Sequence, residues 1–391
     1  MTTPLEGIRV LEVANFITGP YAGQLLADLG AAVIKIEEPQ KGDPFRSWGN
    51  DLYSPHYCAF NRGKQSLTLN LRAETGREIF YRLIPDADVL IENFRPGVTD
   101  RLGIGYEAVR EINPRLIYCS ISGMGQSGPY AQRPAYDTVG QGLSGLLSML
   151  MDVNEPRPVG PAFSDSVTGI FACYGIMGAL LAREKSGRGQ RVAVSMLSAT
   201  LAFLLEPALS YFATGEIPGP YSRPRAAQVY AFTCSDGKAF AVHLSSPAKF
   251  WEGLTSVANR PDLREDPRFR AREDRLANYQ ELQETLAEIF KKEPRSYWLL
   301  RLEEFDVPYT PIHTLAEVFE DPQVRHLGLE VTYDHRSMGK VRSIAPPVEL
   351  SDTPAAKVEP PPTLGEHTDM VLNRLGFDPG AIQRLKREGA I

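Results

Sequence analysis

The sequence predicts an α/β protein built on a parallel sheet. Ile8–Val13 is expected to form a buried strand, a helix follows from Gly19-Pro20 through Leu29, and Ala32–Ile36 is expected as a second strand. A strand–helix–strand unit of this length is the building block of parallel sheets. The helix start after the first strand is a natural anion or nucleotide site. The turn there, residues 15–20, carries neither G-x-G-x-x-G nor a P-loop pattern, so we expect no nicotinamide or ATP site.

The same alternation of strands and helices continues to about residue 216. Apolar runs of strand length predict strands at Ser66–Leu71, Ala87–Asn93, Leu116–Ser122 and Arg191–Ser195. Longer apolar patterns predict helices at Thr75–Leu83, Tyr136–Met151, Ile170–Arg183 and Met196–Ala213. The glycine-rich loop Gly123–Gly128 follows a strand end, where open α/β sheets bind ligands, although a plain turn is an equally good interpretation.

A second, smaller domain is expected in the later part of the chain. Residues 217–225 have the composition of a linker, and Val229–Cys234 and Ala239–Leu244 flank a hairpin turn. Helical patterns follow near 247–258, 279–291 and 294–305, which predicts a small α+β domain over 226–325. The large domain then comprises residues 1–216 and 326–391, with a last hairpin at Leu329–Tyr333 and Lys340–Ile344 and a proline-rich arm at 354–362.

Composition narrows the class of protein. The 391 residues are 43% hydrophobic and 23% charged with a net charge of −6, which is typical of a soluble globular protein and gives no nucleic-acid surface. No signal peptide is evident, and the apolar run Gly169–Ala182 is shorter than a membrane span, so neither secretion nor membrane insertion is expected. The four cysteines form no C-x-x-C pair and the six histidines no metal-binding spacing. We expect a cytoplasmic protein with no metal.

Asp165 is the candidate catalytic residue. It lies in Ser164–Gly169, between a proline-rich run and an apolar helical segment, where a loop becomes the first turn of a helix. A carboxylate there meets unpaired backbone N–H groups and the positive end of the helix dipole, which favours its ionised form. One interpretation is a helix N-cap, because Asp is a favoured cap residue. The other is a carboxylate nucleophile at the edge of an apolar core.

A set of motifs runs along the chain: Pro4–Glu12, Gly19-Pro20, Leu29–Glu37, Asn61–Ser66, Glu92–Gly97 and Lys185–Gln190, and later Asp306–Pro311 and Asp321–Val324. Together these segments resemble the class III (CaiB/BaiF, formyl-CoA transferase-like) CoA-transferase family. The first six of these motifs are spread between residues 4 and 190. The resemblance implies a doubly wound large domain made from both chain ends, a small inserted domain and an interlocked homodimer.

The resemblance also implies an activity and a set of site residues. The family's catalytic aspartate falls on Asp165, and its CoA-contacting positions fall on Thr18, Leu69, Arg72, Asn93, Phe94, Arg101, Leu102 and Tyr136. It implies CoA transfer from an acyl-CoA, with succinyl-CoA as one candidate donor, to a free carboxylic acid. The intermediates would be an aspartyl anhydride and an aspartyl-CoA thioester, with CoA as substrate and product and no further cofactor. An α-methylacyl-CoA racemase or a non-catalytic CoA-binding protein are the alternatives.

The chain departs from other members of the family at several positions. Some members carry histidine and glutamine where this chain has Asn15 and Ile17, and some an arginine at the position of Glu38. The glycine-rich loop of formyl-CoA transferases is replaced by His243–Pro247. We expect His243, Ser245 and Ser246 to border the pocket for the acceptor acid, because hydroxyl and imidazole groups can hydrogen-bond a second carboxylate. A strand end with capping serines is the other interpretation.

Overall fold

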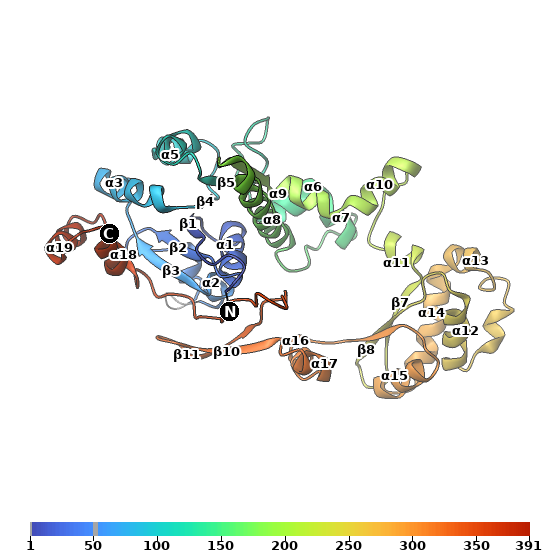
Figure 1. Ribbon diagram of the computed structural model, residues 1–391. Coiled ribbons are helices and arrows are strands. Elements are labelled where there is room, and N and C mark those ends of the chain that lie inside the picture. Colours follow the sequence, from blue (N-terminus) through green and yellow to red (C-terminus); the bar gives the residue numbers. More distant parts are fainter. Residues whose placement is uncertain (1, 50–53) are drawn as a thin grey trace. The chain divides into compact units, whose positions relative to one another are not determined.

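The computed structural model describes residues 2–49 and 54–391 (Figure 1). The chain divides into two compact units, and each is described by itself. The first unit contains Met1–Leu147, Pro158–Leu205 and Leu327–Ile391, and the second contains Ser148–Arg157 and Glu206–His326. The domain boundaries expected from the sequence stay a prediction.

The first unit is built on a parallel sheet of six strands. The strand order is β3-β2-β1-β4-β5-β6, so the chain runs outward from β1 and then returns to start again at β4. This is the strand order of a Rossmann-like, doubly wound fold, and the expected α/β class is confirmed. The strands are β1 Arg9–Val13, β2 Ala32–Glu37, β3 Lys64–Thr68, β4 Val89–Glu92, β5 Ile117–Ser122 and β6 Arg191–Ser195.

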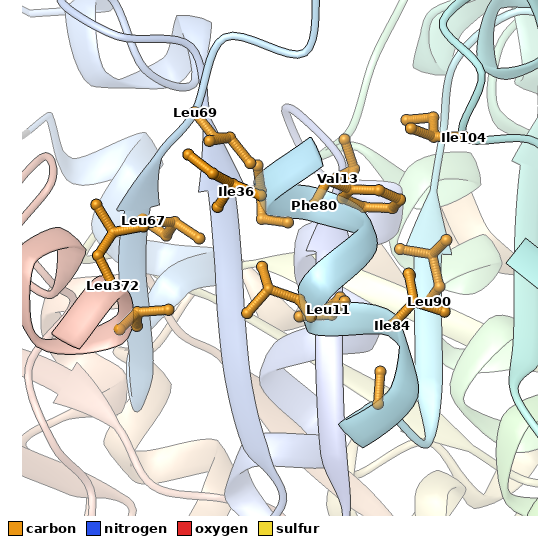
Figure 2. Packing of buried hydrophobic residues seen from close by; sticks show 14 of the residues in the cluster. Leu11, Val13, Ile36, Leu67, Leu69, Phe80, Ile84, Leu90, Ile104 and Leu372 are labelled. Carbon is orange, nitrogen blue, oxygen red and sulfur yellow. The ribbon is translucent and has the colours of Figure 1, made fainter. Parts of the chain in front are cut away.

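Helices cover both faces of this sheet. Because successive side chains of a strand point to opposite faces, Val10 and its neighbour Leu11 enter different cores. Val10 packs with residues of α1 (Thr18–Asp28) and α8 (Phe163–Ser186), while Leu11 packs with residues of α3 (Glu74–Leu83) and α18 (Thr368–Arg374). Figure 2 shows Phe80 and Ile84 lying over the strands that carry Leu11 and Leu90. This burial on both faces explains why the strands read as continuous apolar runs.

The carboxyl-terminal segment completes the first unit at the β3 edge. His367 Nδ1 accepts a hydrogen bond from Ser66 N at 3.2 Å, and Thr368 Oγ1 accepts one from Thr68 N at 3.0 Å. Leu372 packs beside Leu67 (Figure 2). The last elements are β10 Glu330–His335, its antiparallel partner β11 Gly339–Ile344, α18 and α19 Pro379–Arg387. The last predicted hairpin is therefore confirmed.

Two helices expected from the sequence are each broken in two. The segment predicted as one helix over Tyr136–Met151 is α6, Asp137–Ser144, followed by α7, Leu146–Leu150, because Gly145 takes a left-handed φ of 87° that ends α6. The segment predicted over Met196–Ala213 is α9, Met196–Phe203, and α10, Leu205–Thr214. All of α10 except Leu205 belongs to the second unit, whereas α2 Pro55–Asn61, α4 Val98–Arg101 and α5 Tyr106–Ile112 belong to the first.

Helix α8 is longer than expected. It has 24 residues and starts at Phe163, whereas the sequence predicted a start at Ile170. By length and composition it could cross a membrane. Its Ala172, Ile176 and Ala179 are buried against the sheet, however, and core helices of soluble proteins pass the same length test. The packing is that of a core helix.

The second unit has its own antiparallel sheet and core. Strands β7 Val229–Thr233, β8 Ala239–His243 and β9 Tyr309–Ile312 pair in that order, which confirms the predicted hairpin. Phe232, Phe240 and Phe290 pack with Trp298 in the core between sheet and helices. The expected linker contains a short helix, α11 Ser222–Ala226. The remaining helices are α12 Ala248–Val257, α13 Arg272–Ala277, α14 Tyr279–Phe290, α15 Arg295–Glu304, α16 Leu315–Val318 and α17 Pro322–His326.

Candidate active site

The candidate site lies where the strand order reverses, between the carboxyl ends of β1 and β4. Asn93, directly after β4, accepts a hydrogen bond from Asn15 N at 3.0 Å and donates to Asn15 O at 2.7 Å. Its amide also donates to Thr18 Oγ1 at 3.0 Å. Asn93 therefore ties the end of β4 to the turn between β1 and α1. Ligands of doubly wound proteins bind at this crevice.

A buried charge network holds the turn after β1. Phe16 has a φ of 65°, which is unusual for a bulky residue, and its N–H donates to Asp43 Oδ1 at 3.2 Å. Lys35 Nζ lies 2.9 Å from Asp43 Oδ2 and donates to Ala14 O at 2.7 Å. Burial opposes the charge of Lys35, but Asp43 and Glu12 raise its pKa above the ordinary value. The ammonium thus stays charged. It holds Ala14 O directly and Phe16 N through Asp43.

Asp165 lies in the first turn of α8, close to the start of α1. The N-cap of α8 is Ala162, whose side chain makes no capping hydrogen bond. The interpretation of Asp165 as the N-cap is therefore wrong. Gly169 lets the two helices approach closely, since a Cβ there would lie 2.9 Å from Thr18 O. The sequence Asp165–Gly169 thus brings the carboxyl group beside the β1–α1 turn.

Burial makes the Asp165 carboxyl harder to ionise. The residue is 9% exposed, and burial together with the nearby charge of Asp137 raises its pKa to about 7. Asp137 Oδ1 accepts a hydrogen bond from Asp165 N at 3.2 Å. The sequence led us to expect that the helix end would favour the ionised form. Desolvation and the like charge outweigh the helix dipole here.

A cavity of about 250 Å³ brings part of the predicted site together. Its walls come from the β1–α1 turn, the segments after β4 and β5, the stretch before α6, and the start of α8. Five predicted site residues line it: Thr18, Asn93, Phe94, Tyr136 and Asp165. The Phe16 ring packs edge-on against the Tyr136 ring, with centroids 5.7 Å apart.

A second cavity, of about 330 Å³, collects most of the other predicted CoA-contacting residues. It lies at the carboxyl ends of β1 to β4 and is lined by Leu69, Arg72, Phe94 and Leu102. Asn15 and Phe94 line both cavities, so the two are adjacent. Glu38 is exposed and also lines the second cavity. Arg101 is exposed and lines neither.

Two arginines in the first cavity were not among the predicted site residues. Arg95 and Arg133 are exposed and line the same cavity as Asp165. The Arg133 guanidinium lies 3.7 Å from the centroid of the Tyr130 ring. Within residues 2–49 and 54–391, neither arginine makes an ion pair with a carboxylate, so both charges are available to an anion. The position of Arg95 directly after Asn93-Phe94 was the signal in the sequence.

The glycine-rich loop after β5 is tied to a buried carboxyl. Gln126 Nε2 donates to Ser120 Oγ at 2.8 Å, and Ser120 in turn hydrogen-bonds Glu92. Burial raises the pKa of Glu92 to about 7. Gly123 lines the cavity of Asp165, so this end of the loop belongs to the site.

His243, Ser245 and Ser246 lie in the second unit, at the end of β8. All three are exposed, and Leu244 between them is buried. Their part in an acceptor pocket stays a prediction.

The chain matches CoA-transferase family III over residues 5–368. It belongs to this family. The resemblance drawn from its motifs is confirmed, and so is its expected class as an enzyme, a class III CoA-transferase.

Relatives of known activity are similar along most of the chain. The mouse succinyl-CoA:glutarate CoA-transferase is 35% identical over 395 residues, covering 99% of this chain and 90% of the relative. The acetyl-CoA:oxalate CoA-transferase of Acetobacter aceti is 40% identical over 326 residues, with 82% and 83% covered. The formyl-CoA:oxalate CoA-transferase of Streptomyces coelicolor is 35% identical over 409 residues, with 99% of each covered.

Solved structures share the fold. A CaiB/BaiF family protein from Brucella suis superposes with a TM-score of 0.85 at 36% identity, covering 96% of this chain and all of that one. The protein Rv3272 of Mycobacterium tuberculosis superposes with a TM-score of 0.83 at 30% identity, covering 95% and 99%.

Proposed function

We propose that this CoA-transferase moves CoA from succinyl-CoA to a free dicarboxylic acid, with Asp165 as the covalent nucleophile. The observation that carries the proposal is the buried Asp165 carboxyl in the switch-point cavity, beside Thr18, Asn93 and Tyr136. The activity named for the mouse relative, which this chain resembles over 99% of its length, supports the choice of donor.

The first half of the proposed reaction loads the enzyme. A carboxylate oxygen of Asp165 attacks the thioester carbonyl carbon, the C–S bond breaks, and CoA leaves as the thiolate. The product is a mixed anhydride between Asp165 and the acyl group. The thiolate then attacks the Asp165 carbonyl carbon, and the acyl group leaves as a free carboxylate. CoA is now held as a thioester on Asp165.

The second half repeats these steps in reverse with the acceptor. The acceptor carboxylate attacks the aspartyl thioester and releases the thiolate, which gives a second anhydride. The thiolate attacks the acceptor's acyl carbon, so the new acyl-CoA forms and the Asp165 carboxylate is regenerated. No oxidant, metal or net proton is consumed, because each step exchanges one acyl bond for another.

The site's electrostatics suit this sequence of steps. Each attack produces a negatively charged tetrahedral oxygen, and backbone N–H groups at a helix start can stabilise such a charge. The thiolate must remain bound between steps, which requires contacts far from the reacting carbon. Arg95 and Arg133, which pair with no carboxylate among the described residues, supply positive charge in the same cavity for an anionic ligand.

The decisive experiment replaces the nucleophile. Asp165→Asn keeps the shape of the side chain but removes the nucleophilic oxygen, and Asp165→Ala removes the group. Both variants should lose CoA transfer and still bind CoA. Asp152→Asn, at an exposed aspartate of the second unit, is the matched control and should remain active.

Trapping identifies the intermediate directly. Succinyl-CoA followed by hydroxylamine should modify the peptide that contains Asp165, and the same treatment of Asp165→Ala should not. Transfer by Asp165→Ala at a rate near that of the wild type would overturn the proposal.

The acceptor is proposed to meet the exposed loop after β8. Hydroxyls of Ser245 and Ser246 and the imidazole of His243 can hydrogen-bond the second carboxylate of a dicarboxylic acid. Replacing both serines by alanine should shift the ranking of glutarate, succinate and oxalate as acceptors. An unchanged ranking would favour the interpretation as a simple strand end.

A further inference from the structure

Two strained residues face each other where the β7–β8 hairpin ends. Val229 and His243 form the last residue pair of this ladder. Gln228 and Ser245, just beyond it, have left-handed φ values of 50° and 51°. Such a conformation is disfavoured for residues other than glycine and persists where the surroundings enforce it.

The Gln228 side chain links the two segments. Its Nε2 donates to Ser245 O, while Ser245 N donates to Ala227 O at 2.9 Å. Both backbone polar groups of Ser245 are therefore held by the opposite segment. Gln228 is 2% exposed, so water does not compete for these bonds.

Arg275 in turn hydrogen-bonds the side chain of Gln228. Its Nε donates to Gln228 Oε1 at 2.7 Å, and its Nη1 donates to Phe269 O at 2.9 Å. The guanidinium also lies over the Trp251 ring, 4.8 Å from the centroid. Arg275 is 5% exposed, and its partners in the described part of the chain are the neutral oxygens of Gln228, Phe269 and Arg270. Burying an arginine without a counter-charge costs desolvation free energy, which these hydrogen bonds must offset.

The loop held in this way carries exposed polar groups. The buried Leu244 anchors it, whereas His243, Ser245 and Ser246 remain exposed, and α12 begins at Ala248. A buried cation and two strained residues are thus arranged around a short polar surface segment. Strain of this kind is characteristic of ligand-binding segments whose shape must exist before the ligand arrives.

We propose that Gln228 and Arg275 are positioning residues that fix the loop His243–Pro247 in the conformation that selects the acceptor acid. The inference rests on the proposed CoA transfer to a dicarboxylic acid. Gln228 and Arg275 do not touch the acid. They determine where the hydroxyls and imidazole of the loop stand, and therefore which length of dicarboxylic acid fits.

Gln228→Glu tests this clamp, the hydrogen-bonded chain Arg275–Gln228–Ser245, with the smallest change. The variant keeps an oxygen for Arg275 Nε and gives the buried arginine a counter-charge, so the domain should stay folded. It replaces the donor to Ser245 O by an oxygen that repels that carbonyl. Gln283→Glu is the matched control, because Gln283 Nε2 donates to Ala231 O of the same strand at 2.6 Å but does not touch the loop.

Two measurements are made on each full-length variant. Hydrogen–deuterium exchange should become faster at the Ser245 amide in Gln228→Glu and stay at the wild-type rate in Gln283→Glu. Steady-state assays with succinyl-CoA should show KM for glutarate rising about tenfold in Gln228→Glu, because small displacements of a recognition group weaken binding strongly. The rate at which succinyl-CoA alone labels Asp165 should not change.

The outcomes separate the two proposals. Unchanged exchange at Ser245 would overturn the clamp, and faster exchange with an unchanged KM for glutarate would overturn its role in acceptor selection. If Gln228→Glu does not fold, Arg275→Lys, which keeps the buried positive charge but removes the Nε bond to Gln228, replaces it with the same expected results. Wild-type protein that transfers CoA to no dicarboxylic acid would instead contradict the proposed function, while the exchange data would still report on the clamp.

Discussion

The Asp137 carboxylate accepts a hydrogen bond from the backbone N–H of Asp165 at 3.2 Å. Asp137 is the first residue of α6, and Asp165 lies in the first turn of α8. The bond occupies one N–H of the α8 start and places a second negative charge near the proposed nucleophile. Together with burial, which is the larger cause, this charge raises the pKa of Asp165 to about 7.

The pH dependence of catalysis should report this pKa. Only ionised Asp165 can attack a thioester, so kcat/KM for the acyl-CoA should rise with pH and level off above about 7. Asp137→Asn keeps an acceptor oxygen for Asp165 N but removes the charge, so the inflection should move to lower pH. The shift should be smaller than the full displacement from 3.8, because burial remains. A profile that is flat between pH 5 and 8 would contradict this prediction.

Stability should depend on the same group. Because the folded-state pKa of about 7 exceeds the unfolded value of 3.8, folding favours the protonated form, and stability falls as pH rises from about 4 through 7. At about 1.4 kcal/mol per pH unit, the loss approaches roughly 4 kcal/mol at pH 8. Asp165→Asn should therefore be more stable than the wild type in urea unfolding at pH 8 and nearly equal at pH 4. Equal stability of the two proteins at pH 8 would show that burial of the Asp165 carboxyl does not destabilise the protein.

Asn93 should matter for CoA binding beyond its effect on stability. Asn93→Ala removes the amide that joins the β1–α1 turn to β4, and we expect KM for acyl-CoA to rise about tenfold with a loss of ~1–3 kcal/mol in stability. Asn113→Ala is the control, since Asn113 Nδ2 donates to Ile84 O and Ala87 O away from the cavities. It should lose similar stability with an unchanged KM. If both variants raise KM equally, Asn93 acts through stability alone.

The protein should be an obligate homodimer with threaded chains. Helix α8 exposes Ile170, Tyr174 and Leu181 along one side, although its other side is in the core. Apolar surface of this kind is commonly covered by a partner. Light scattering should give about twice the chain mass of 43.3 kDa at every dilution. A folded species of single-chain mass at low concentration would rule out threading.

Racemase activity should be absent. Racemisation needs a second acid/base on the face of the α-carbon opposite Asp165, and the phenol of Tyr136, which lines the same cavity, is a poor base at neutral pH. Tyr136 is 65% exposed at the cavity rim and packs against Phe16. A 2-methylacyl-CoA incubated with enzyme in D2O should gain no α-deuterium above the uncatalysed rate. Enzymatic incorporation would restore the racemase alternative.

Local patterns in the sequence were sufficient for most of the fold. The six strands of the parallel sheet and both hairpins lie where apolar runs and turn residues indicated them, because these signals act over a few residues. The breaks at Gly145 and Leu204 were missed, since both lie inside runs whose apolar periodicity suits one helix. A glycine within a helical pattern is often tolerated, so its left-handed φ could not be foreseen.

The sequence by itself determined the parallel α/β architecture, the family motifs and the place of Asp165 in the first turn of a helix. Only the tertiary structure decided the surroundings of that carboxyl: Asp137, 28 residues away, and the burial that together raise its pKa. It also joined Gln228 to Ser245 and distributed the predicted CoA residues other than Arg101 over two adjacent cavities. Propensity and periodicity are properties of neighbouring residues, whereas desolvation and charge coupling depend on groups that meet only when the chain folds.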